Sequence, residues 1–99
     1  MSTGRDMTVY VDDMRRTAAV AGRKDRWSHL MADNSEELFA FAVGIGLRPE
    51  WVQKPGTYRE HFDVTDAIRR RALAFGAVPV GFLALGKWAR QRRATLGPA

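Results

Sequence analysis

Short apolar runs, separated by polar and basic stretches, predict strands that alternate with helices along this chain. An apolar, β-branched run over 7–11 predicts a buried strand that ends at two aspartates, Asp12 and Asp13. Residues 27–31 predict a second strand, in which alternate side chains face opposite ways. The basic stretch 14–26 shows no sustained period, so we interpret it as a loop or a weak helical turn.

Helical spacing and capping residues predict three helices. The first begins at the N-cap candidates 33–35 and ends at Gly46, which suits the left-handed conformation of a C-cap. Its inner face carries apolar residues three or four apart, namely Leu38, Phe41, Ala42 and Ile45. A second helix runs from the N-cap candidate Thr65 to Phe75, and a third, basic helix covers 82–93.

The remaining segments complete an α/β pattern. Residues 51–53 and 77–80 are further short strands, and Pro79 indicates a sheet edge because proline cannot donate to a β-ladder. The segment 54–60 contains a Pro-Gly pair and is a loop, whereas 61–64 is extended or irregular. Since helices and strands alternate, we predict an α/β domain with a small, mainly parallel sheet of about four strands and two or three packed helices.

Length and composition indicate one domain, with its core over about 7–80. The chain has 99 residues, too few for two cores, and 45% of them are hydrophobic, as in a folded globule. The absence of cysteine excludes disulfides, thiolate nucleophiles and cysteine-ligated zinc. No signal-peptide pattern or run of some 20 apolar residues is present, so we expect a cytoplasmic protein that does not bind membranes. The large exposed surface of so small a domain favours a homo-oligomer.

Four separated motifs share a specific set of polar residues and spacings. They are VYVDD at 9–13, WSHLMAD at 27–33, the helix from Glu36 to Leu47, and HFDV at 61–64. As a set they resemble a family of small bacterial, notably actinobacterial, and phage proteins of unknown function. The resemblance covers residues 7–80, and the family usually has tyrosine where this chain has Phe62. Because the family has no established activity, the resemblance indicates the boundaries of the fold and the positions of these motifs, but no function.

Polar residues follow several of the predicted strands. Ligands of parallel α/β sheets bind beyond the carboxyl ends of the strands, so we expect a polar rim there. The rim comprises Asp12, Asp13, Asp33, Asn34, Gln53, His61 and Asp63.

Two interpretations of this rim stay open for Asp12, Asp13, His61 and Asp63. As a divalent-metal site, their carboxylates and imidazole suit Mg²⁺, Mn²⁺ or Zn²⁺, which could polarise a phosphate and generate hydroxide. In the other interpretation the adjacent aspartates form a turn, and Asp63 or Thr65 caps the second helix.

Aromatic and basic side chains extend the candidate ligand site. His29 shares a strand face with Trp27, so it either contacts a ligand beside an aromatic platform or is satisfied within the core. Trp27, Trp51 and Trp88 are more typical of core residues than of ligand platforms. Arg69 completes the predicted ligand-binding set at the rim.

The net charge of +5 suits an anionic partner but also keeps many small proteins soluble. The outer face of the last helix could contact nucleic-acid phosphates through Lys87, Arg90, Arg92 and Arg93. Three functions are therefore ranked. The first is binding of a small phosphorylated or nucleotide-like ligand, in sequestration if the protein is phage-encoded. The second is a metal-dependent phosphodiesterase or nuclease that uses the same residues, and the third is a non-specific nucleic-acid-binding module.

Overall fold

A computed structural model describes residues 8–96 of the chain, with side chains as far as Arg92. Met7 of the first predicted strand, the side chain of Arg93 and the predicted tail over 97–99 lie outside the described residues. The elements in order are β1 (Val9–Asp12), β2 (Arg16–Val20), β3 (Arg23–Ala32), α1 (Ser35–Gly44), the 3-10 helix η1 (Pro49–Trp51), β4 (Phe62–Thr65), α2 (Asp66–Ala74), β5 (Val78–Val80) and α3 (Phe82–Leu96).

Strand β3 is the centre of a five-stranded mixed sheet. It pairs antiparallel with β1 and β2, which follow one another along one side, and with β4 on the other side. Strand β5 pairs parallel with β1. The strand that contains Pro79 therefore lies at an edge of the sheet, as predicted.

The prediction of a mainly parallel sheet is wrong, because β1 and β5 form a parallel pair whereas β3 pairs antiparallel with β1, β2 and β4. Parallel neighbours need a crossover of about a dozen residues, usually a helix. No helix separates β1 from β3 along the chain, so these two strands meet in the antiparallel sense.

The basic stretch 14–26 is a β-hairpin and not the predicted loop or helical turn. Strands β2 and β3 pair from Arg16 opposite Trp27 to Val20 opposite Arg23. The two residues of the turn, Ala21 and Gly22, both have positive φ, at 51° and 79°. Two-residue turns of this kind match the twist of the flanking strands.

The strand predicted over 51–53 is also absent from the structure. Pro49–Trp51 form a single 3-10 turn that begins at Pro49, a position where a missing N–H costs no internal hydrogen bond. Gln53 alone retains strand-like pairing, through an isolated antiparallel bridge with His61.

The predicted helices are confirmed by their caps. Asn34 accepts a hydrogen bond from the N–H of Glu37 at the start of α1, and Thr65 accepts one from the N–H of Ile68 at the start of α2. Gly46, just beyond α1, has the positive φ expected after a helix C-terminus. Helix α3 begins at Phe82 as predicted and extends to Leu96.

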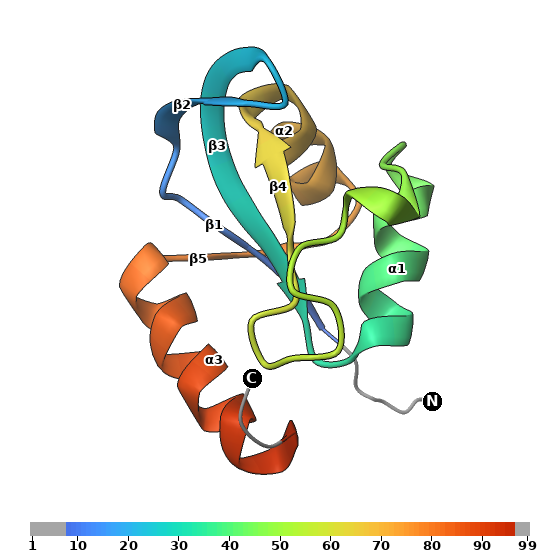
Figure 1. The fold of residues 1–99 in the computed structure, drawn as a ribbon, viewed down its shortest axis with the longest axis vertical. Helices are drawn as coiled ribbons and strands as arrows, with labels where there is room; N and C mark the ends of the chain where they lie inside the picture. Colours follow the sequence, from blue (N-terminus) through green and yellow to red (C-terminus); the bar gives the residue numbers. More distant parts are fainter. Residues whose placement is uncertain (1–7, 97–99) are drawn as a thin grey trace.

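Helices cover both faces of the sheet. Figure 1 shows α1 and α2 on one side of β3 and α3 on the other. The larger core joins α1 and α2 to the sheet and includes the fully buried Val11, Leu30, Leu38 and Phe62. The smaller one joins Met31 to Leu85 and Ala89 of α3. The part of the second face that carries His29 lies beyond this smaller core and stays partly exposed.

Candidate metal centre

The pairing of β3 with β4 brings two histidines and an aspartate together. His29 is the cross-strand partner of Asp63. His61 lies on the same face as Asp63 because it precedes it by two residues in extended chain. One ring nitrogen of each histidine and a carboxylate oxygen of Asp63 lie within 4.8 Å of one another, and all three residues are partly exposed. We call these three residues the His-His-Asp cluster.

Asp12 of β1 holds His29 from the neighbouring strand. Its Oδ1 accepts a hydrogen bond from the main-chain N–H of His29 at 2.9 Å, and its Oδ2 lies 2.7 Å from the ring Nδ1. The Asp12 side chain is fully buried, whereas 29% of the His29 side chain is exposed. The hydrogen bond with Asp12 raises the pKa of His29, and burial of the ring opposes this effect.

The main chain orients His61 in a similar way. Its Nδ1 lies 2.6 Å from the carbonyl oxygen of Arg59. A carbonyl oxygen and an ionised carboxylate only accept hydrogen bonds, so the proton of each neutral ring resides on Nδ1. The Nε2 atoms of His29 and His61 therefore keep their lone pairs, which is the form of imidazole that binds a metal ion.

The spacing of His61 and Asp63 fits two ligands of one metal ion. Nε2 of His61 lies 3.5 Å from Oδ1 of Asp63. Two ligand atoms bound tetrahedrally, each about 2.1 Å from the ion, are about 3.4 Å apart. In the metal-free protein, the protonated form of His61 can donate from Nε2 to Asp63, and this contact lowers the pKa of Asp63 and favours the ionised carboxylate. Two imidazoles and one carboxylate suit Zn²⁺ or Mn²⁺ and leave coordination positions open for water and substrate.

The start of α3 lies near His29, and a basic residue of α2 contacts the main chain of Asp12. The Phe82 ring stacks near His29, with 6.1 Å between ring centroids. The Phe82 N–H donates to Oδ1 of Asp13 at 2.9 Å. Arg69 donates from Nε to the carbonyl oxygen of Asp12 at 2.8 Å. The N-terminal end of a helix and a guanidinium therefore lie beside the residues that hold His29.

The four residues predicted as metal ligands have three different roles in the structure. His61 and Asp63 belong to the cluster, Asp12 positions His29, and Asp13 binds the first N–H of α3. The helix-capping role that we considered for Asp63 or Thr65 belongs to Thr65.

Other residues of the predicted rim lie elsewhere. The rim presupposed parallel strands that end at one edge, and antiparallel pairing separates these ends. Asp33 lies four residues beyond His29 along the chain. It accepts hydrogen bonds from the Tyr10 hydroxyl and the Thr8 N–H. Gln53 pairs with His61 through the main chain, and its side chain lines a separate cavity together with Trp27.

Sequence reasoning assigned His29 to the ligand site but not to the metal site. The signal was present, because WSH at 27–29 and HFD at 61–63 each place polar or aromatic residues at alternate positions. Only an antiparallel assignment of these two strands puts His29 opposite Asp63. Trp51, interpreted as a core residue, is 51% exposed.

The basic face predicted for α3 is only partly present. Lys87 and Arg90 are exposed, but Arg92 is buried and its guanidinium lies 5.4 Å from the centre of the Trp88 ring, one turn earlier. The outward position predicted for Arg92 is therefore wrong, because its stem and head group pack on an aromatic ring.

Among residues 8–96, no helix has both the length and the apolar character that a membrane span requires. No curated protein and no solved structure matches the chain.

A family model described as "Protein of unknown function (DUF4031)" matches residues 9–92. The match continues past residue 80, where the resemblance noted from the motifs ends, and takes in most of α3. It also contains all three residues of the His-His-Asp cluster. The chain therefore belongs to the DUF4031 family, whose function is unknown.

Proposed function

We propose that this protein is a metal-dependent phosphoesterase that hydrolyses a small phosphorylated substrate at the His-His-Asp cluster. One observation carries the proposal. Asp12 and the Arg59 carbonyl hold the Nδ1 atoms of His29 and His61, which leaves the Nε2 lone pair of each neutral ring available, and Oδ1 of Asp63 lies 3.5 Å from Nε2 of His61. Metal-binding histidines are oriented in this way, by an acceptor on the nitrogen that does not bind the ion.

The chemistry follows from the open coordination positions. A divalent ion held by two imidazoles and a carboxylate lowers the pKa of a bound water and polarises a phosphoryl oxygen. In the overall reaction the water oxygen bonds to phosphorus and the ester P–O bond breaks. The departing alcohol oxygen takes up a proton from the water, so that an alcohol and inorganic phosphate, or a phosphomonoester from a diester, are released.

The surroundings favour a phosphorylated substrate. Arg69 lies against Asp12, and the N-terminal end of α3 borders His29. Helix N-termini and guanidinium groups both stabilise phosphate oxygens. The net charge of +5 also favours the approach of an anionic substrate.

Metal binding is tested on the full chain after removal of metal with a chelator. We expect titration calorimetry with Mn²⁺ or Zn²⁺ to show one ion per chain in the wild type. His61→Ala and Asp63→Asn should abolish this binding. Asp25→Asn is the matched control, because Asp25 also lies on the sheet but bonds Arg23 and the N–H of Arg26. Equal metal binding by wild type and Asp63→Asn would contradict the assignment.

Turnover is tested with p-nitrophenyl phosphate and bis(p-nitrophenyl) phosphate. We expect release of p-nitrophenolate that requires the metal, stops with EDTA and is lost in Asp63→Asn but not in Asp25→Asn. Metal-dependent binding of phosphate without any product would overturn the hydrolase assignment. The same cluster would then serve a ligand-binding protein without catalysis.

A further inference from the structure

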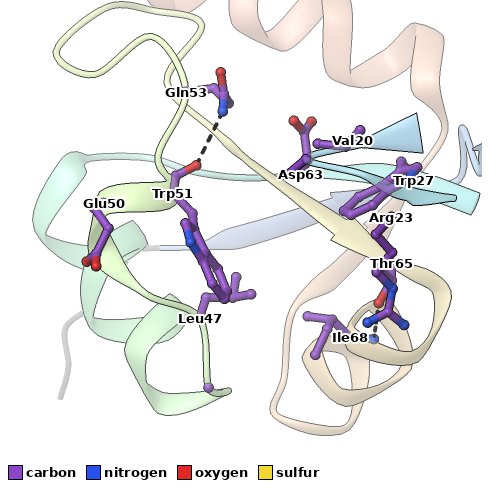
Figure 2. Close-up of a pocket in the computed structure, with 12 residues that line it drawn as sticks. Val20, Arg23, Trp27, Leu47, Glu50, Trp51, Gln53, Asp63, Thr65 and Ile68 are labelled. Atoms are coloured by element: carbon purple, nitrogen blue, oxygen red, sulfur yellow. Dashed lines mark hydrogen bonds between the residues drawn. The ribbon is translucent and has the colours of Figure 1, made fainter. Parts of the chain in front are cut away.

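A cavity of about 550 Å³ lies along the outer edge of β4, beside the His-His-Asp cluster. Figure 2 shows Trp51 and Trp27 on opposite sides of this cavity, with Leu47 and Ile68 between them at its lower end in that view. The walls are thus largely apolar and aromatic. Small-molecule sites have this size and character.

The cavity exists because η1 takes the chain away from β4. Gln53 and His61 exchange main-chain hydrogen bonds of 2.8 and 3.1 Å as an antiparallel pair. Two residues further, the same register would place Trp51 opposite Asp63. The 3-10 turn η1 instead moves the segment that contains Trp51 away from β4. As a result, Asp63 borders both the cavity and the cluster.

The two tryptophans are suited to hold a planar group. The Nε1–H of Trp27 donates to the carbonyl oxygen of Ala18 at 2.8 Å, which fixes the orientation of its ring. Trp51 is 51% exposed, so the part of the chain that the structure describes leaves much of this aromatic surface uncovered. A planar base that stacks on Trp51 would bury apolar area, and such stacking tolerates any base.

We propose, on the basis of the phosphoesterase function above, that the substrate is a nucleotide whose base enters this cavity while its phosphate reaches the cluster. In Figure 2 the Asp63 carboxylate points away from Ile68 and the cavity floor. A ligand that contacts both sites must therefore pass over the edge of β4. A base and a phosphate joined by a sugar have this extended form, and Gln53 at the cavity wall supplies an amide for the edge of the base.

The test compares AMP with ribose 5-phosphate, which carries the same sugar and phosphate but no base. Affinities are measured with the Mn²⁺-loaded full chain over times in which no phosphate is released. We expect AMP to bind about tenfold more tightly or better. Trp51→Ala should remove this preference and leave the affinity for ribose 5-phosphate unchanged, whereas Trp51→Phe should keep most of it. Leu83→Ala is the control, because Leu83 is 80% exposed on α3. Thermal unfolding of Trp51→Ala checks that the fold is intact.

The outcomes separate this inference from the proposed function. Equal, metal-dependent affinity for AMP and ribose 5-phosphate would overturn the base site and leave the phosphoesterase proposal standing. Metal-independent AMP binding that is lost in Trp51→Ala would support the base site and overturn the metal assignment. Absence of binding by both probes would overturn both.

Discussion

Asp12 and His29 lie on neighbouring strands with Oδ2 of the carboxylate 2.7 Å from Nδ1 of the ring, and the same carboxylate also holds the main-chain N–H of His29. One buried aspartate thus fixes both the backbone and the ring of a residue in the His-His-Asp cluster. Asp12 is a positioning residue in this arrangement, because its oxygens bond His29 and the N–H of Met14, and it acts on the cluster through the His29 ring.

Replacement of Asp12 with asparagine should lower the pKa of His29 in the metal-free protein. The hydrogen bond and the negative charge of Asp12 favour the protonated ring, and the neutral amide of the variant would supply no charge. NMR titration of the His29 ring measures the midpoint directly. Asp25→Asn should leave it unchanged. A midpoint that does not move in Asp12→Asn would contradict the role of this contact.

The same contact makes the stability of the metal-free protein depend on pH. The folded-state pKa of His29 lies above its unfolded value of about 6.5. The stabilisation is therefore fully present below about pH 6.5 and is lost as pH rises through the folded-state pKa. We therefore expect the difference in unfolding free energy between wild type and Asp12→Asn, measured by urea titration, to shrink as pH rises from about 6.5 through the folded-state pKa of His29.

Metal affinity should also fall in Asp12→Asn, although Asp12 is not a ligand in the proposed centre. A metal-bound histidine donates a hydrogen bond from the ring nitrogen that does not bind the ion. Loss of the acceptor of this hydrogen bond typically weakens metal binding about 10- to 100-fold. Calorimetric titration with Zn²⁺ measures the change. Asp13→Asn serves as a neighbouring control, because Asp13 bonds the start of α3 and not His29. Equal loss in both variants would point to a general effect on the fold.

The helices were predictable because their signals are local. Asn34 and Thr65 are residue types that commonly cap helices, and each directly precedes its helix in the sequence. The apolar residues that begin at Leu38 are spaced so that they lie on one face of a helix. Strand pairing is not local in this sense. The hairpin over 16–27 has no apolar alternation, since most of β2 is exposed, and its turn lacks the usual Asn-Gly or Asp-Gly pair.

The missed hairpin also explains what was missed at the site. If 14–26 is a loop, the sequence does not show that β3 runs antiparallel to its neighbours. A parallel sheet then predicts a ligand site at the ends of the strands and not on the face of β3 and β4. His61 and Asp63 were still identified, because HFD is a short polar motif in one segment. The partnership of His29 with Asp63 depends on the register of β3 and β4, which no local pattern specifies.

The turn of this hairpin should accept stabilising substitutions. Ala21 has a φ of 51°, a conformation that costs a residue with a side chain about 1–2 kcal/mol, whereas asparagine and glycine tolerate it better. We expect Ala21→Asn to raise the free energy of unfolding by about 0.5 kcal/mol. Gly22→Ala, at a φ of 79°, should lower it by about 1 kcal/mol. Urea denaturation measures both, and a loss of stability in Ala21→Asn would contradict the turn geometry.

Arg92 should be replaceable by methionine without loss of stability. Burial lowers the pKa of its guanidinium, and Nε and Nη1 are buried with no hydrogen-bond partner among the described residues. A buried charge without hydrogen-bond partners opposes folding, so a flexible apolar side chain against Trp88 should raise the free energy of unfolding by about 1 kcal/mol. Arg90→Met, at an exposed position of the same helix, should change it by less than about 0.5 kcal/mol. If Arg92→Met instead loses stability while Arg90→Met does not, attraction of the guanidinium to Glu60 and Asp33 outweighs its desolvation, and Arg92 stabilises the packing of α3 as a charged residue.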